Sequence, residues 1–171
     1  GSAYLNDFSV VAARFVAKWN CFFGKGDKPA ELIKKLSFDK YNKIYDDGTT
    51  FISQLPEECR RYEQAFDCNF TLSNNFYKSF FSGLPKTYKA KNYSKIPKDL
   101  PLLLIAGDGD PVGGYGKLME KLYRFYKEKV GVKSVKKVIY QKVRHEYLND
   151  TSREAVKKEI ADFAESIKKR V

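Results

Sequence analysis

The stretch Leu102-Leu103-Leu104-Ile105-Ala106-Gly107-Asp108-Gly109-Asp110-Pro111-Val112-Gly113 decides the fold of this chain. It is an apolar run followed directly by a turn that carries two carboxylates. A continuous apolar run bounded by turn residues is typical of a strand buried on both faces of a parallel sheet. We therefore expect a strand over residues 100–106 and an acid turn over residues 107–113.

A second stretch, Val143-Arg144-His145-Glu146-Tyr147-Leu148-Asn149-Asp150, contains the only histidine in the chain. We name residues 143–150 the histidine loop. A strand is expected before it, over residues 135–143, and an amphipathic helix over residues 115–130 separates the two strands. Gly131 suits the end of that helix, and a last helix follows Thr151 or Ser152.

Strand, helix, strand and helix in this order form a β-α-β-α arrangement with parallel strands, so the expected fold class is α/β. Ligand sites in such sheets lie beyond the carboxyl ends of the strands. Asp110 and His145 both fall there, one after each strand. The pattern therefore predicts that an acid and a base lie near each other.

A carboxylate that is held in a turn can orient an imidazole and stabilise its charged form, and histidine suits a general base near neutral pH. Each residue also has a plainer interpretation. Asp108 and Asp110 are common turn formers, and a single histidine is often structural. The order in the chain, acid before base at successive strand ends, favours the catalytic interpretation.

Residues 3–95 are rich in Phe, Tyr, Asn and Lys and are expected to be helical. The predicted helices cover residues 8–24, 30–36, 56–65 and 74–82, and the last is expected to stop at Gly83 and Pro85. Residues 46–48 are expected to form a turn. Two interpretations of the aromatic residues stay open: they pack in a core, or they line an acyl pocket.

The composition excludes several classes of protein. A net charge of +11 fits a lysine-rich surface or contact with an anionic membrane, but no nucleic-acid-binding motif is present, and we expect no nucleic acid partner. Three cysteines without paired spacing indicate a reducing compartment, and neither a metal site nor a cofactor motif is apparent. With no apolar run of roughly 20 residues and no signal-peptide pattern, a cytoplasmic protein is expected.

At these motifs the chain resembles α/β-hydrolases of the serine aminopeptidase, monoacylglycerol lipase and lysophospholipase type. The resemblance rests on the acid turn and on the run Arg-His-Glu-x-Leu-Asn-Asp of the histidine loop. It implies that Asp110 is the acid of a catalytic triad and His145 its base, with Arg144 and Glu146 bracing the loop. It also implies that residues 1–95 form the helical cap, or lid, and residues 96–171 the C-terminal part of the hydrolase core.

The chain departs from this family in two respects: no Gly-x-Ser-x-Gly elbow occurs in its 171 residues, and the upstream His-Gly type loop that supplies part of the family's oxyanion hole is missing as well. We therefore expect the nucleophilic serine to lie in an N-terminal half of the fold outside this sequence. The expected function is hydrolysis of a small carboxylic ester or lipid, like that of a lysophospholipase or monoacylglycerol lipase, and this chain alone is expected to be inactive. The alternatives are a non-catalytic basic interaction module and a degenerate hydrolase.

Overall fold

The computed structural model of the chain describes residues 3–6, 8–68 and 70–168. Its internal contacts divide the chain into two compact units. The core unit contains Gly1–Tyr4, Tyr41–Glu63 and Ile96–Val171, and the helical unit contains Leu5–Lys40 and Gln64–Lys95. A single boundary near residue 96 was expected from the sequence. The contacts instead group residues 41–63, which lie between the two helical segments, with the core unit.

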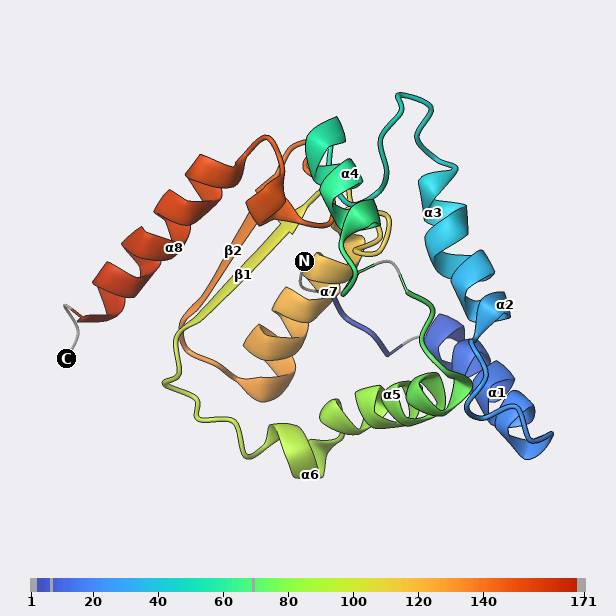
Figure 1. Cartoon of the computed structure of the whole chain (residues 1–171). Helices are drawn as coiled ribbons and strands as arrows, with labels where there is room; N and C mark the ends of the chain where they lie inside the picture. Colours follow the sequence, from blue (N-terminus) through green and yellow to red (C-terminus); the bar gives the residue numbers. More distant parts are fainter. Residues whose placement is uncertain (1–2, 7, 69, 169–171) are drawn as a thin grey trace. The chain divides into compact units, whose positions relative to one another are not determined.

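Two parallel strands form the sheet of the core unit, as the sequence predicts (Figure 1). Strand β1 (Leu102–Gly107) pairs with β2 (Val135–Tyr140) in a register that runs from Leu102 opposite Val135 to Gly107 opposite Tyr140. The last four residues of β1 are buried, whereas β2 is only half-buried. The carboxyl ends of both strands thus lie at the same edge of the sheet.

Strand β2 ends three residues earlier than expected. Lys142 has a left-handed φ of 60°, so the chain turns there instead of continuing as a strand. The backbone amide of Lys142 donates a hydrogen bond to the carboxylate of Asp108 in the acid turn. Asp108 therefore fastens the turn after β2 to the turn after β1.

Helices of the core unit follow the expected order with shifted starting points. The helix between the strands is α7 (Lys117–Arg124), which continues as a π-helical segment, η2 (Phe125–Val130). It begins two residues late because residues 114–116 have positive φ values that a right-handed helix excludes. Gly131 ends it in the left-handed conformation, as predicted. The other helices of this unit are α4 (Pro56–Gln64), the 3₁₀ turn η3 (Tyr147–Asn149) and α8 (Arg153–Lys168).

The helical unit is built on two helices that pack together, α1 (Phe8–Phe22) and α5 (Asn74–Thr87). Shorter elements complete it: α2 (Glu31–Lys34), the π-helical segment η1 (Lys35–Asp39) and α6 (Ala90–Tyr93), while α3 (Lys40–Asn42) lies where the chain passes into the core unit. The buried cluster of this unit consists of two alanines, one isoleucine and one tyrosine: Ala17, Ala30, Ile33 and Tyr77.

Helix α5 does not stop at Gly83 and Pro85, so the predicted end of this helix was wrong. It continues to Thr87, with Pro85 inside its last turn. A proline removes one backbone donor, and near a helix end that loss is small because few later turns depend on it. The hydroxyl of Thr87 donates to the carbonyl of Leu84 at 2.7 Å, which adds a contact in this turn.

No helix formed by the described residues is both long enough and apolar enough to span a bilayer.

Candidate active site

The turn after β1 buries the side chain of Asp110. This residue is 1% exposed. Its Oδ1 accepts a hydrogen bond from the backbone amide of Val112 at 2.8 Å, and its backbone carbonyl accepts one from the amide of Tyr115 at 2.9 Å. Hydrogen bonds within its own turn therefore already fix the carboxylate, independently of any contact with the histidine loop.

Two glycines let the acid turn approach the histidine loop. A Cβ atom on Gly107 would overlap the backbone carbonyl of Val143, and one on Gly109 would overlap that of Lys142. In the actual structure the amide of Gly109 donates to the carbonyl of Val143 at 3.0 Å. A side chain at either glycine would push the two loops apart and separate the acid from the base.

His145 faces the buried acid across this contact. Its Nδ1 lies 3.0 Å from Oδ2 of Asp110. We assign the ring proton to Nδ1, because the carboxylate can only accept, and this leaves the lone pair on Nε2. The imidazole is 30% exposed, so a reactant can approach it, whereas the carboxylate behind it is buried.

The backbone of His145 is also held. Its amide donates to the carbonyl of Phe51 at 3.1 Å, and the centroid of the Phe51 ring lies 5.7 Å from that of the imidazole. The structure thus brings together the two residues that the sequence placed at successive strand ends. Their catalytic role stays a prediction.

The two residues expected to brace the histidine loop flank His145. Arg144 is buried, and its guanidinium donates to the backbone carbonyls of Thr50 at 2.7 Å and Ser53 at 3.1 Å. Glu146 uses its backbone amide to donate to the carbonyl of Ile52 at 2.9 Å, and its carboxylate accepts from the side chain of Asn149 at 2.8 Å. Both residues therefore connect the loop to its surroundings, and their bracing role stays a prediction.

Three residues around the site were not singled out from the sequence: Tyr45, Asp47 and Asp150. Hydrogen bonds from Thr49 and Arg144 lower the pKa of Asp47 to about 2, and burial raises the pKa of Tyr45. Asp47 was expected only as a turn residue, and it lies 97 positions from its Arg144 partner. A single sequence carries no signal for such a pair, whereas paired substitutions among related sequences would reveal it.

The described part of the chain brings no three His, Cys, Asp or Glu side chains together in an arrangement that could bind a metal ion.

Comparisons with known proteins find a matching family model and similar solved structures. A family model described as serine aminopeptidase, S33, matches residues 13–152. A thermostable carboxyl esterase from Bacillus coagulans, solved in complex with glycerol, superposes with a TM-score of 0.77 and 24% identity, covering 94% of this chain and 53% of its own. A lipase in an open form superposes with a TM-score of 0.71 and 18% identity, covering 96% of this chain and 52% of its own. No curated protein matches the chain.

The chain spans about half the length of these two solved structures. They share its α/β-hydrolase fold, and the family model matches most of its residues. The chain therefore belongs to the serine aminopeptidase S33 family of α/β-hydrolases.

Proposed function

We propose that this chain supplies the acid and the base of a serine hydrolase that cleaves carboxylic esters. One observation carries the proposal: the buried carboxylate of Asp110 lies 3.0 Å from Nδ1 of a partly exposed imidazole, that of His145. This arrangement directs Nε2 of the same ring away from the carboxylate, where a serine hydroxyl can approach it. The membership in a hydrolase family and the likeness to an esterase and a lipase support the same reaction class.

The reaction follows from these positions. The serine oxygen attacks the ester carbonyl while its proton passes to Nε2 of His145, and Asp110 stabilises the imidazolium through Nδ1–H. The tetrahedral intermediate collapses, the C–O bond to the alcohol breaks, and the proton on Nε2 passes to the leaving alkoxide. A water molecule then repeats the sequence on the acyl-enzyme and releases the acid.

The nucleophilic serine belongs, in this proposal, to the N-terminal half of the same hydrolase fold. Support comes from the absence of a Gly-x-Ser-x-Gly elbow in this sequence and from the half-length coverage of the two similar structures. That half is the main partner of this chain, and the two together form the active enzyme.

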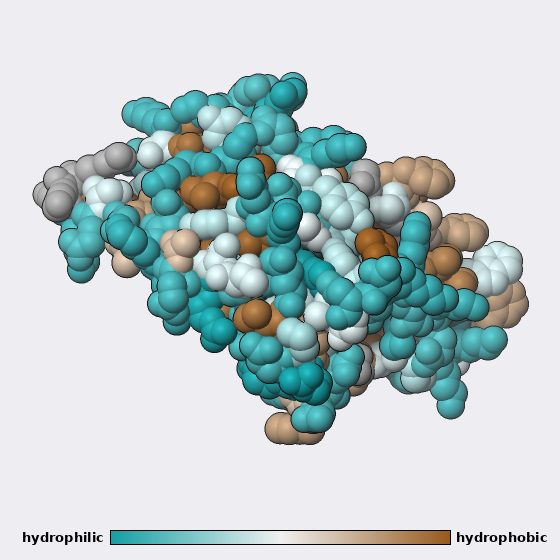
Figure 2. Space-filling model, turned by 90° about the horizontal axis from the view of Figure 1, so that it is seen from above, coloured by the Kyte–Doolittle hydropathy of each residue, from teal (hydrophilic) through white to brown (hydrophobic). Residues whose placement is uncertain are grey.

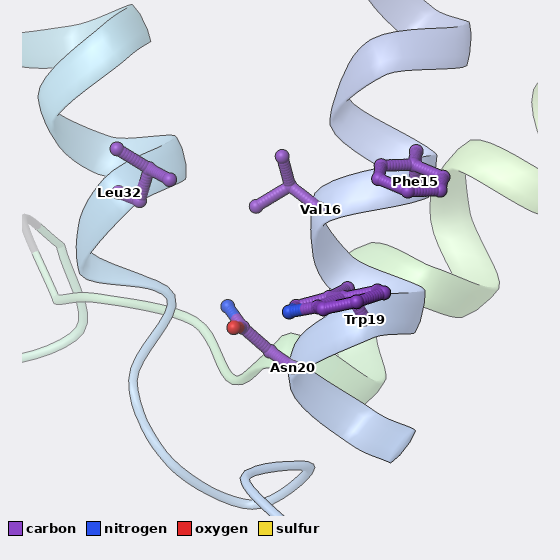
Figure 3. A pocket seen from close by; sticks show the side chains of 5 residues that line it. All are labelled: Phe15, Val16, Trp19, Asn20 and Leu32. Carbon is purple, nitrogen blue, oxygen red and sulfur yellow. The ribbon is translucent and has the colours of Figure 1, made fainter. Parts of the chain in front are cut away.

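The substrate class that we propose is a lipid-like ester, such as a monoacylglycerol or a lysophospholipid. Helix α1 supports it, because large apolar side chains on this helix are exposed: Phe8, Val11, Phe15, Trp19 and Phe22. An open pocket of about 230 Å³ lies beside them, lined by Phe15, Val16, Trp19, Asn20 and Leu32 (Figure 3). Such a surface favours acyl chains over polar substrates.

Peripheral contact with an anionic membrane is the second part of this proposal. The helical unit contains twelve Lys and Arg residues against five Asp and Glu residues, and its exposed aromatic side chains suit the membrane interface. In the space-filling view, hydrophobic groups interrupt an otherwise largely hydrophilic surface (Figure 2). The cationic side chains would attract the bilayer, and the aromatic ones would enter it.

We also propose a cytoplasmic location. None of the three cysteines, Cys21, Cys59 and Cys68, forms a disulfide within the described residues, and a reducing compartment agrees with this.

The test uses enzyme that contains this chain together with the half carrying the nucleophile. A fluorophosphonate probe should label that enzyme, and His145→Ala should lower both the labelling rate and ester turnover by several orders of magnitude, on the order of 10⁴-fold. An ester turnover that is unchanged in His145→Ala would contradict the proposal. Absence of labelling in the unaltered enzyme would favour a non-catalytic module or a degenerate hydrolase.

A further inference from the structure

Residues 45–54, here named the strap, connect the acid turn to the histidine loop within the core unit. At one end the hydroxyl of Tyr45 donates to the backbone carbonyl of Gly109 at 2.7 Å. Further along, the carbonyls of Phe51 and Ile52 accept the backbone amides of the two residues at the centre of the histidine loop at 3.1 and 2.9 Å. The strap therefore touches both loops that hold the proposed acid and base.

A second buried carboxylate ties the strap to the histidine loop. Asp150 is 1% exposed, so its position is unlike that of an ordinary surface aspartate. Its Oδ2 accepts the backbone amide of Arg144 at 2.7 Å, and its Oδ1 accepts the backbone amides of Gln54 at 3.1 Å and Thr151 at 2.8 Å. One side chain thus fixes the residue before His145 and the end of the strap together.

The guanidinium of Arg144, a residue of the histidine loop, makes further contacts with the strap. In addition to the strap carbonyls of Thr50 and Ser53, it donates to the hydroxyl of Thr49 and, at 2.7 Å, to the carboxylate of Asp47. Its carbon Cζ lies 3.7 Å from the centroid of the Tyr45 ring, a stacked cation–π geometry. A planar group with several fixed donors is needed for this set of contacts, which lysine cannot reproduce.

We propose that Arg144 and Asp150 are positioning residues that clamp the strap onto the histidine loop and thereby keep Nδ1 of His145 on Asp110. The inference builds on the proposed function, because the pairing that it explains is the proposed catalytic one. A partly exposed imidazole turns easily about its side-chain bonds. The clamp limits this movement, because it fixes the residues before and after His145 to the strap. Loss of the clamp frees the backbone and lets the ring leave the carboxylate.

The single histidine of the chain makes a direct test possible, because each ring nitrogen gives one resonance in a ¹⁵N spectrum of the 171-residue chain. At about pH 9 an ordinary histidine is neutral, and its ¹⁵N shifts report which nitrogen carries the proton. The unaltered chain should show the proton on Nδ1, facing Asp110. Arg144→Met and Asp150→Asn should shift the resonances toward a mixture of the two tautomers, and Arg144→Lys should give an intermediate shift.

Arg124→Met is the matched control, since Arg124 is an exposed arginine of α7 whose ion pair with Glu120 lies away from the strap. It should leave the tautomer unchanged. Circular dichroism and a thermal melt identify the variants that keep the fold. Folded Arg144→Met or Asp150→Asn chains with the unaltered tautomer would overturn the clamp.

Milder variants keep the proposal falsifiable if those substitutions prevent folding. Asp47 is half-exposed, so Asp47→Asn should fold and shift the tautomer in the same direction by a smaller amount. Tyr45→Phe removes only the hydroxyl that donates to Gly109 and should act likewise. No shift in either folded variant would contradict the clamp. The tautomer measurement needs neither the nucleophile nor a substrate. An unchanged tautomer would therefore contradict the clamp without affecting the ester-hydrolase proposal. Failure of the ester-hydrolase proposal would likewise leave the tautomer measurement valid.

Discussion

The two units of this chain differ in which side chains they bury and which they expose. In the core unit several charged and polar groups are buried and form hydrogen bonds with distant parts of the chain. The guanidinium of Arg144, for example, donates to residues more than 90 positions away. In the helical unit large aromatic side chains stay exposed, including Phe15 at 64% and Trp19 at 56%.

This difference fits the division of tasks that we propose, with the acid–base pair in the core unit and lipid contact in the helical unit. Buried hydrogen bonds cost free energy when they are left unmade, so a network of them fixes a geometry. The core unit therefore contains what an acid–base pair needs, a fixed orientation. Exposed apolar surface lowers its free energy by taking up an apolar ligand or surface, and the helical unit contains what contact with a lipid needs.

The largest effect on stability should come from Gly107→Ala. The added methyl group would overlap the carbonyl of Val143 where the two loops of the site meet. We expect the free energy of unfolding to fall by about 3 kcal/mol, the upper range for forced overpacking, as measured by urea unfolding of the chain.

Gly83→Ala in α5 of the helical unit is the matched control, because the added Cβ would meet no described atom within 4 Å beyond its chain neighbours and the nearby backbone of its own helix. Alanine favours helix over glycine, so this variant should be neutral or stabilised by up to roughly 1 kcal/mol. Equal destabilisation by the two substitutions would contradict the tight contact between the acid turn and the histidine loop.

A moderate effect is expected on lipid binding by the helical unit. Trp19 is the only tryptophan of the chain. It is exposed and lines the pocket beside α1 (Figure 3), so its fluorescence reports directly on that surface. Vesicles with anionic lipid should shift its emission to the blue, and added salt should reverse the shift. Phe15→Ser should weaken the binding about tenfold or more, given the free energy of burying one aromatic side chain.

Phe66→Ser is the comparison for this experiment, since Phe66 is also exposed in the helical unit but lies outside α1. It should change the vesicle affinity little. Binding that is equal with neutral vesicles, or equally weakened by both substitutions, would argue against α1 as the contact surface.

The smallest effect concerns the pH dependence of stability. Because the pKa of Asp47 is lowered in the folded chain to about 2, its carboxylate stabilises the fold at pH values above the ordinary aspartate pKa, about 3.9. This contribution is lost as the pH falls from about 4 to about 2. The difference in unfolding free energy between the unaltered chain and Asp47→Asn should therefore be larger at pH 7 than at pH 2.

Asp46→Asn, one position earlier, serves as the control for this pH series. A difference between the unaltered chain and Asp47→Asn that stays constant from pH 7 to pH 2 would show that the charged carboxylate of Asp47, with its hydrogen bonds from Thr49 and Arg144, adds nothing to stability.

Local patterns predicted much of the core unit. The apolar run of β1, the acid turn and the histidine loop each lie within about a dozen residues, so their residue types indicated the parallel strands, and the structure confirms them. The same patterns placed Asp110 and His145 at one edge of the sheet. The end of α5 was wrong because the tolerance of Pro85 depends on its place in the last turn, which residue type alone does not give.

The strap could not be predicted, because the contacts that hold it to the acid turn and the histidine loop join positions far apart in the sequence. Tyr45 reaches Gly109 across 64 positions, and Asp47 reaches Arg144 across 97. The sequence around Asp47 has the composition of an ordinary turn, and the hydrogen bond to Arg144 that distinguishes it forms only when folding brings these two parts of the core unit together. Residues 41–63 were for the same reason expected in the helical cap, while the contacts group them with the core unit.

The central claim is that Asp110 and His145 act as a catalytic acid–base pair, and the two aspartates of the acid turn test it most directly. The measurement is kcat for a soluble ester with enzyme that includes the nucleophile half, comparing Asp110→Asn with Asp108→Asn. Asp110 faces the imidazole, whereas Asp108 only accepts the amide of Lys142. The account predicts that Asp110→Asn lowers kcat about 10⁴-fold and that Asp108→Asn has a far smaller effect. Equal losses, or full activity of Asp110→Asn, would contradict it.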